Sequence, residues 1–195
     1  MTQGSLFSDQ NLQSRETLDH IYQEIFKEAS LKFPGKAFIF GDGNRFSSVV
    51  FVGESPGLPD VETGKPFQGP VGQLLDKILA AIQLDRQRVY LTNVVKFVSS
   101  ADEISADLLS FFTPYLFREI AVINPKLIVT LGNTPTKVFI NSKDKISALR
   151  GRFYDFNGIK ILPTFNPAYL LRDPSKKKEV WEDMKIAREF IDKLS

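Results

Sequence analysis

Residues 53–72 bring together one acid, one aromatic ring and a group of turn-forming residues. The segment reads Gly-Glu-Ser-Pro-Gly-Leu-Pro-Asp-Val-Glu-Thr-Gly-Lys-Pro-Phe-Gln-Gly-Pro-Val-Gly. The carboxylate of Glu54 can act as a base or offset a developing positive charge, and the ring of Phe67 can stack on a flat ligand. Glycine and proline supply the turns of a loop. The segment therefore predicts a loop that builds a binding or catalytic site.

Regular elements are predicted on both sides of this loop. Residues 47–52 form a short run that is rich in β-branched valine and is followed by Gly53, which predicts a buried strand. After the loop, apolar residues recur at helical spacing from Val71 to Ile82, with Pro70 at the helix start. Ligands of open α/β sheets bind at the carboxyl ends of strands, so the loop lies where chemistry is expected.

The rest of the chain alternates between helical and strand patterns. Further helices are predicted over 18–29, 105–123, from 134 and over 174–194, and further strands over 89–95, 127–131 and 159–165. Residues 37–40 predict a short edge strand. Strands separated by helices imply a parallel sheet covered on both faces. Residues 1–14 are polar and aperiodic and predict a mobile tail, so residues 15–195 are expected to form a single domain.

The composition excludes several classes of protein. The chain has 195 residues, of which 43% are hydrophobic, enough for one sizeable core. It has no long apolar run and no signal-peptide pattern, so we expect a soluble, cytoplasmic protein that crosses no membrane. The absence of cysteine excludes disulfides and thiolate metal sites, and the single histidine, His20, argues against a Ser-His-Asp triad. A net charge of +2 does not by itself indicate nucleic-acid binding.

Four separated motifs occur in order along the chain. They read Gly-Glu-Ser-Pro-Gly at 53–57, Gly-Lys-Pro-Phe-Gln-Gly at 64–69, Tyr-Leu-Thr-Asn-Val-Val-Lys at 90–96 and Pro-Thr-Phe-Asn-Pro-Ala-Tyr-Leu-Leu-Arg at 163–172. At this spacing they resemble the uracil-DNA glycosylase superfamily, and most closely its family 4. The resemblance implies a three-layer α/β/α sandwich around a four-stranded parallel sheet. It also implies an enzyme that hydrolyses the N-glycosidic bond of uracil in DNA, with other deaminated bases left open as substrates.

The chain departs from family 4 at the positions of its iron–sulfur ligands. Family 4 holds the cluster through four cysteines, and the aligned residues here are Phe26, Ala29, Phe97 and Phe112. No cluster can form on these side chains, so neither a cofactor nor a metal is expected. We expect the three rings and the alanine to replace the cluster by burial, linking the first helix to the segment after residues 89–95.

A second departure concerns Asn166, where family 4 has histidine before the proline. Asn-Pro at this position resembles the mismatch-specific branch of the superfamily, so asparagine is not in itself inactivating. One alternative stays open. The chain could be a noncatalytic member of the fold that binds nucleic acid or a nucleobase, in which Asn166 marks lost chemistry.

The chemistry of base excision explains the proposed roles. The N-glycosidic bond breaks with positive charge on the sugar and negative charge on the departing base. Glu54 is expected to activate water and offset the sugar charge, and Asn166 to donate to uracil O2. The carboxamide of Asn93 can accept from uracil N3–H and donate to O4, whereas cytosine would leave groups unpaired.

The remaining base-site residues are assigned shape rather than chemistry. Phe67 is expected to stack on the flipped base, and Ser55 and Gly53 are small enough to let the base approach. Each site residue also has a structural alternative. Glu54 could be a solvated loop acid, Asn93 and Asn166 turn or capping residues, and Phe67 a core residue.

DNA contacts are expected from the last motif and the helix after it. The resemblance implies Leu170 as the wedge that enters the space left by the flipped base, with Tyr169 or Leu171 sharing that role. The alternative is that these are core residues. Four basic residues gather here, which indicates either phosphate contacts or a solvated run of charge: Arg172, Lys176, Lys177 and Lys178.

The N-terminal tail carries a possible partner motif. Gln3-Gly4-Ser5-Leu6-Phe7 resembles the short peptide with which bacterial repair proteins dock on the sliding clamp, and a chance pentapeptide is the alternative. Gln3 would supply the polar end, and Leu6 and Phe7 the apolar anchors.

Otherwise the protein is expected to act as a monomer. A different kind of nucleotide-binding α/β protein has only the Gly-rich loop in its favour, because the Walker lysine spacing is missing.

Overall fold

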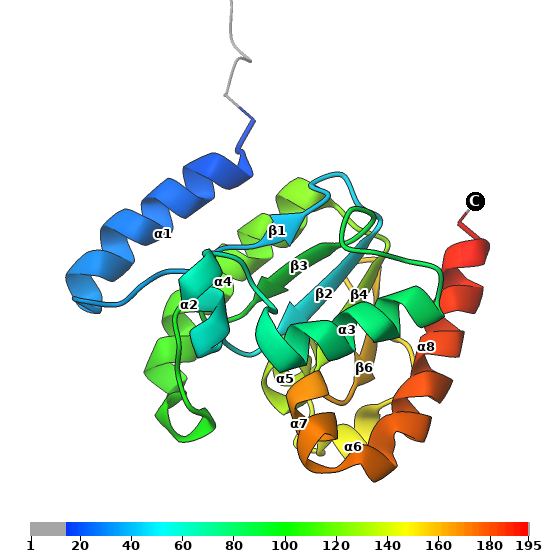
Figure 1. Ribbon diagram of the computed structural model, residues 1–195. Helices are drawn as coiled ribbons and strands as arrows, with labels where there is room; N and C mark the ends of the chain where they lie inside the picture. The colour runs from blue at the N-terminus through cyan, green and yellow to red at the C-terminus, as the bar shows by residue number, and fades with distance from the viewer. Residues whose placement is uncertain (1–14, 195) are drawn as a thin grey trace, which may run out of the picture.

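A six-stranded sheet with the order β1-β3-β2-β4-β6-β5 forms the centre of the molecule (Figure 1). The computed structural model describes residues 15–194. The four inner strands are parallel: β3 (Tyr90–Asn93), β2 (Val49–Gly53), β4 (Leu127–Leu131) and β6 (Ile159–Thr164). The two short edge strands, β1 (Asp42–Gly43) and β5 (Tyr154–Phe156), are antiparallel to their neighbours. The predicted four-stranded parallel sheet is therefore confirmed, with two edge strands added.

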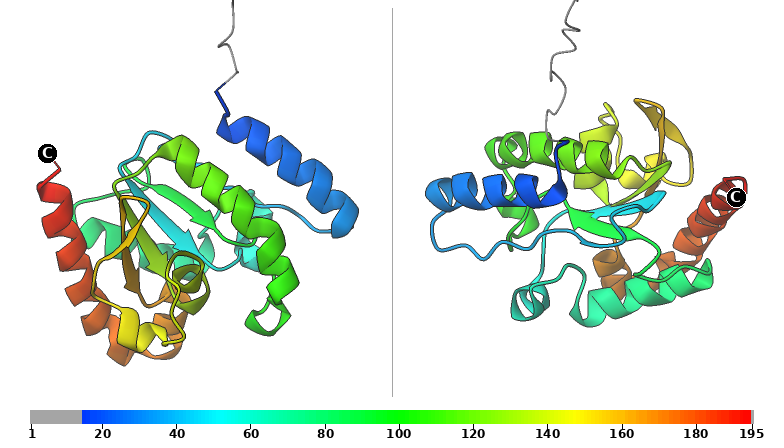
Figure 2. Two further views of the ribbon diagram at one scale, coloured as in Figure 1. Left: turned by 180° about the vertical axis from the view of Figure 1, so that it is seen from behind. Right: turned by 90° about the horizontal axis from the view of Figure 1, so that it is seen from above.

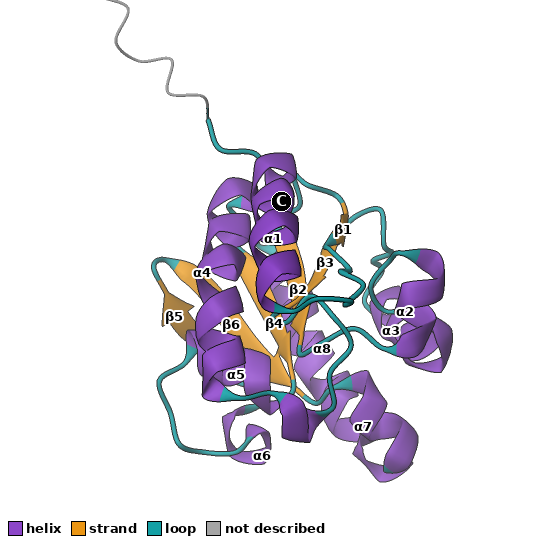
Figure 3. Cartoon of the chain, turned by 90° about the vertical axis from the view of Figure 1, so that its left-hand side faces the viewer, coloured by secondary structure: helices purple, strands orange, loops and turns teal. Residues whose placement is uncertain are grey.

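Helices cover both faces of the sheet, which gives the α/β/α sandwich (Figures 2 and 3). One face carries α1 (Leu18–Lys32), α4 (Ala106–Ile123) and α5 (Asn133–Phe139), and the other carries α3 (Gly69–Ala81), α7 (Pro167–Arg172) and α8 (Lys177–Asp192). The short elements are α2 (Leu58–Thr63), α6 (Ile146–Leu149) and the 3₁₀ turns η1 (Ala101–Glu103) and η2 (Pro174–Lys176). Within residues 15–194, none of the helices is long and apolar enough to cross a membrane.

The side chains of β2 show why both faces must be covered. Alternate residues of a strand point to opposite sides of the sheet. Val50 and Val52 pack into the core on the α1 side, whereas Val49 and Phe51 pack into the core on the α3 side. All four are buried. An uninterrupted apolar run is what a strand with two buried faces requires.

The edge strand predicted over residues 37–40 is wrong. These residues form no strand, although Ile39 N–H donates to the carbonyl of Lys96 at 2.7 Å. The edge strand lies at Asp42–Gly43 instead, just after the predicted segment. Gly43 pairs with Tyr90 in the sheet. Its φ is 111°, a conformation that glycine adopts readily.

The predicted aromatic replacement for the iron–sulfur cluster is correct for Phe97 and Phe112 and wrong for Phe26. The rings of Phe97 and Phe112 are buried with centroids 5.7 Å apart, close to the buried Ala29. Phe26 is 59% exposed, because on α1 it lies beside the buried stripe that contains Ile25. Phe33 packs on Phe97 in its place, at 5.2 Å.

Candidate active site

Four polar side chains follow the ends of the four parallel strands. Asn93 is the last residue of β3, and Glu54 directly follows β2. Thr134 lies shortly after the end of β4, in α5, and Asn166 lies shortly after the end of β6. Parallel strands place their carboxyl ends at one edge of the sheet. The four residues therefore lie along that edge in the spatial order of their strands.

Glu54 and Asn166 line one cavity of about 530 Å³. The hydroxyl of Thr134 donates to Oε2 of Glu54 and orients the carboxylate. Asn166 is the N-cap of α7: its Oδ1 accepts from Ala168 N–H at 2.8 Å, and its Nδ2 donates to the carbonyl of Leu131 at 3.2 Å. A carboxamide nitrogen carries two hydrogens, so the contact with Leu131 leaves one for a ligand.

Asn93 and Phe67 converge on Gly53. Asn93 is 3% exposed, and within the described chain its buried Oδ1 has no hydrogen-bond partner. A side-chain carbon added to Gly53 would lie 2.4 Å from that Oδ1 and 2.7 Å from Cζ of Phe67. Gly53 therefore lets the amide oxygen and the ring approach the backbone more closely than any side chain at this position would allow. Buried acceptors are rarely left unpaired, so this oxygen is a candidate acceptor for a donor on a ligand.

A buried ion pair supports the backbone of Asn93. Lys96 and Glu119 are fully buried, and Nζ of Lys96 lies 2.5 Å from Oε2 of Glu119. The same Nζ donates to the backbone carbonyl of Asn93 at 2.7 Å and to Oγ1 of Thr92 at 2.8 Å. Burial lowers the pKa of Lys96, and the Glu119 carboxylate opposes that shift.

A tyrosine, Tyr22, completes this network, and its pKa is also shifted. Tyr22 donates to Oε1 of Glu119 at 2.8 Å. Burial and then the neighbouring Glu119 raise the pKa of Tyr22, which keeps the hydroxyl neutral as a donor. α1 and α4 are thus linked through polar atoms to the strand end that carries Asn93.

The structure places the remaining predicted base-site and rim residues as follows. Ser55 donates its hydroxyl to the carbonyl of Ser99 at 2.9 Å, so it ties the β2–α2 loop to the segment after β3. Tyr169 and Arg172 line the same cavity as Glu54, and the Arg172 guanidinium lies 6.0 Å from the Tyr169 ring centroid.

Leu170, Lys176 and Lys177 do not line this cavity. Leu170 is 1% exposed and packs in the core between α3 and α8, which contradicts a wedge role in this conformation. The helical phase of α7 instead exposes Leu171, at 46%. Lys176 pairs with Glu179 at 3.1 Å, and Lys177 borders a separate groove between α3 and α8.

Three residues of the site region have no role that the sequence predicts. Thr134 lies where the sequence predicts only a helix start, Lys96 ends the third motif, and Lys145 belongs to none of the four motifs. Lys145 lines the Glu54 cavity, as Arg172 does. A pattern of residues could not identify Lys145 or Thr134, because they reach the site only through the folding of the segment after β4.

The residues at the implied iron–sulfur positions do not fit such a cluster. Clusters are held by cysteine thiolates, with histidine as an occasional substitute. The aligned side chains here are hydrocarbon, and Phe97 and Phe112 pack against each other where ligands would stand. Their chemistry offers iron no donor atom.

Comparisons with known proteins agree with the geometry of the strand ends. The family model described as uracil DNA glycosylase superfamily matches residues 40–185. The type-4 uracil-DNA glycosylase of Thermotoga maritima is 36% identical over 92% of this chain and 98% of its own length. The type-4 uracil-DNA glycosylase of Saccharolobus solfataricus is 36% identical over 90% of this chain and 87% of its own. The type-4 uracil-DNA glycosylase of Archaeoglobus fulgidus is 32% identical, with 91% and 95% covered.

Proposed function

The chain belongs to the uracil-DNA glycosylase superfamily, and we propose from this membership that it is a monofunctional glycosylase that hydrolyses the N-glycosidic bond of uracil in DNA. The observation that supports this function best is the unpaired, buried Oδ1 of Asn93 beside the ring of Phe67. It is the arrangement that a flat base with one N–H donor requires.

The amide of Asn93 selects uracil by hydrogen-bond polarity. Its Oδ1 accepts from N3–H of the base, and its Nδ2 donates to O4. Cytosine presents an acceptor at N3 and a donor at C4, so both groups would face a like partner and remain unpaired in a buried site. Phe67 stacks on the base after it has left the DNA helix.

Glu54 and Asn166 carry the hydrolysis. As the bond between C1′ and N1 breaks, its electron pair moves to the uracil ring, and the second N–H of Asn166 stabilises the charge at O2. Water attacks C1′ from the side of Glu54, whose carboxylate offsets the sugar charge and accepts the proton. The Thr134 hydroxyl holds the carboxylate in position.

One assay tests the function directly. A uracil-containing oligonucleotide incubated with the protein should become cleavable by alkali, because excision leaves an abasic site. The same oligonucleotide with cytosine in place of uracil should stay intact. Tight binding of the uracil strand without excision would instead identify a noncatalytic member of the fold.

Asn166→Ala is expected to lower uracil excision by about tenfold or more, since it removes a donor to the leaving group. The same change removes the cap of α7, which costs about 1 kcal/mol of stability. Asn166→Asp separates the two effects, because a carboxylate can still accept from Ala168 N–H but donates nothing. Single-turnover rates should fall in both variants, and both should unfold at lower temperature, the alanine variant through the lost cap and the aspartate variant through the lost contact with the Leu131 carbonyl. An unchanged rate in Asn166→Asp would show that the residue only caps the helix.

DNA contacts are proposed at the rim of the Glu54 cavity. The exposed Leu171 is better placed than Leu170 to enter the space left by the base, with Tyr169 beside it. Arg172 and Lys145 supply positive charge for the neighbouring phosphates.

We also propose that the enzyme needs no iron–sulfur cluster or other cofactor and acts in the cytoplasm. We further propose that it acts as a monomer.

The N-terminal motif supports a further partner. Gln3, Leu6 and Phe7 lie outside the described residues, so the proposed docking on a bacterial sliding clamp rests on sequence alone. A peptide of residues 1–12 is expected to bind the cognate clamp with roughly micromolar affinity, since two apolar anchors must offset the ordering of the segment. Calorimetric titration measures it, with the Leu6→Ala, Phe7→Ala double variant as the control. Equal affinities for the two peptides would remove the clamp from the partners.

A further inference from the structure

Phe67 has a backbone conformation that is rare for a bulky residue. Its φ is 57°, in the left-handed region, and its side chain is 6% exposed. Such a conformation is strained for an aromatic residue and persists only where surrounding contacts hold it. The glycines at 64 and 69 also have positive φ, which they adopt without strain. A third glycine at position 67 would adopt this φ without strain, so the phenylalanine must be held there by its neighbours.

Asp60 holds the N–H side of this turn. Asp60 lies in α2 and is 4% exposed. Its Oδ2 accepts from the N–H groups of Phe67 at 3.1 Å and Gly57 at 3.2 Å, and its Oδ1 accepts from Gln68 N–H at 2.8 Å. The Asp60 carboxylate thus accepts from the backbone N–H groups of two consecutive residues, Phe67 and Gln68, on either side of the Cα of the strained residue.

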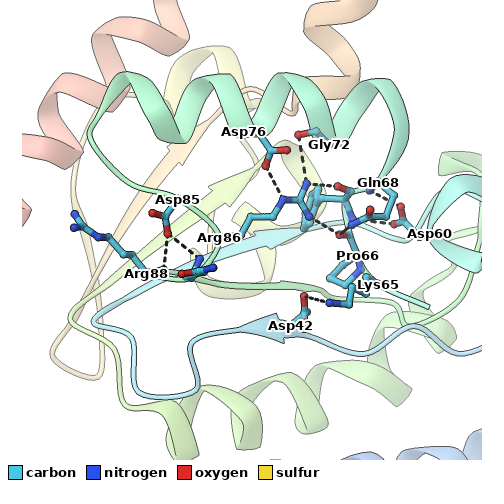
Figure 4. Close-up of polar contacts among 12 residues, drawn as sticks. Asp42, Asp60, Lys65, Pro66, Gln68, Gly72, Asp76, Asp85, Arg86 and Arg88 are labelled. Atoms are coloured by element: carbon cyan, nitrogen blue, oxygen red, sulfur yellow. Dashed lines mark hydrogen bonds and ion pairs between the residues drawn. The ribbon is translucent and has the colours of Figure 1, made fainter. Parts of the chain in front are cut away.

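Arg86 holds the carbonyl side of the same turn. Figure 4 shows its guanidinium between Asp76 and the Pro66–Gln68 turn. Arg86 Nη1 donates to the carbonyl of Pro66 at 3.2 Å, and Nη2 donates to the carbonyl of Phe67. Its Nε donates to Asp76 at 2.6 Å, which fixes the guanidinium against α3. The planar fork of arginine suits contacts in several fixed directions.

The start of α3 is shaped to receive this turn. A side-chain carbon added to Gly72 would lie 1.9 Å from the Phe67 carbonyl oxygen and 2.9 Å from Nη2 of Arg86. Glycine at this position therefore lets the carbonyl and the guanidinium meet. On the other side of the residue, the tip of the Phe67 ring lies against Gly53, next to the unpaired Oδ1 of Asn93.

We propose that Arg86 is a positioning residue for base recognition: with Asp60 it holds Phe67 in the left-handed conformation that sets its ring beside Gly53 and Asn93, ready to stack on the flipped base. The inference rests on the proposed glycosylase function and assigns it a specificity-determining contact outside the four motifs. Arg86 acts on the reaction through the ring of Phe67.

A double-mutant cycle tests this route. Arg86→Gln is expected to lower single-turnover uracil excision by about tenfold, whereas in a Phe67→Ala background the same change should have less than about a twofold effect. Arg88→Gln is the matched control, since Arg88 lies on the same loop but donates to the carbonyl of Gln83 at 3.2 Å, away from the turn. Equal losses from Arg86→Gln in both backgrounds would overturn the proposal.

Amide hydrogen exchange gives a readout that does not depend on activity. The amides of Phe67 and Gln68 should exchange slowly in the wild-type protein and at least about tenfold faster in Arg86→Gln, with no change in Arg88→Gln. If Arg86→Gln fails to fold, Arg86→Lys takes its place, because it keeps the charge but loses the fork. Unchanged protection at Phe67 would overturn the proposal. A wild-type protein without excision would contradict the proposed function alone, and exchange would still decide the role of Arg86.

Discussion

Asn93→Asp is expected to lower uracil excision by at least about a hundredfold, or about 2.7 kcal/mol of transition-state stabilisation. The change replaces the Nδ2 donor with a carboxylate oxygen that faces uracil O4. Because the side chain is 3% exposed, water cannot compensate for the two acceptors that then meet. Single-turnover rates on a uracil oligonucleotide measure the effect.

Asn157→Asp is the matched control for this change. Asn157 lies in the turn between β5 and β6, at the opposite edge of the sheet from the strand ends of the site, so it adds the same charge away from the base. It should keep excision within about twofold of the wild type, as exposed substitutions usually do. Thermal unfolding of both variants separates loss of function from loss of fold. A wild-type rate in Asn93→Asp would remove Asn93 from base recognition.

Glu54→Gln is also expected to lower excision by about a hundredfold or more, through a different step. Glutamine keeps the size of the side chain and an oxygen that can accept from Thr134, so the local structure should persist. What is lost is the negative charge that offsets the sugar cation and accepts the proton from water. The fall should therefore appear in the rate of the bound complex, with affinity for uracil-containing DNA changed far less.

An exposed acid on the neighbouring helix provides the comparison for Glu54. Glu62 lies in α2 and faces solvent, so Glu62→Gln removes the same charge without touching the cavity. Its excision rate should match that of the wild type. If Glu54→Gln and Glu62→Gln excise uracil equally fast, Glu54 has no part in the chemistry.

The inner strands of the fold could be predicted because their apolar runs are unambiguous. The strand predicted at 127–131 matches β4 to the residue, since both of its faces are buried. The strand predicted at 89–95 ends at Asn93. The consecutive N–H groups of Val94 and Val95 both donate toward the β2 segment, to the carbonyls of Gly53 and Glu54, whereas the N–H groups of a regular strand alternate in direction. A pattern of side chains does not record that change in backbone direction.

Of the two edge strands, β5 has a recognisable sequence signal and β1 has none. Asn157–Gly158 is a typical hairpin turn, with φ values of 51° and 83°, and it could have identified β5. β1 has only two residues, Asp42 and Gly43, and no apolar pattern. Its place depends on the pairing with β3, which local sequence does not encode.

Within the candidate site, sequence indicates the polar residues at the strand ends more readily than the residues that hold them. Glu54, Asn93 and Asn166 stand at strand ends, where polarity after an apolar run is visible in sequence. Leu170 and Leu171 are adjacent on α7, and their helical phase relative to the core decides which one is exposed. Arg86 holds Phe67 across 19 residues of chain, a contact that no local pattern indicates.

The buried pair of Lys96 and Glu119 also limits how this protein can evolve. Replacing one partner leaves the other as an uncompensated charge in the core, which costs about 3 to 5 kcal/mol, whereas replacing both with apolar residues of similar volume is often neutral. Single-step drift at either position is therefore blocked, and any lineage that abandons the pair must change both residues together. Since Lys96 also donates to the Asn93 carbonyl, such a lineage would have to find a new donor for the backbone at the end of β3 at the same time.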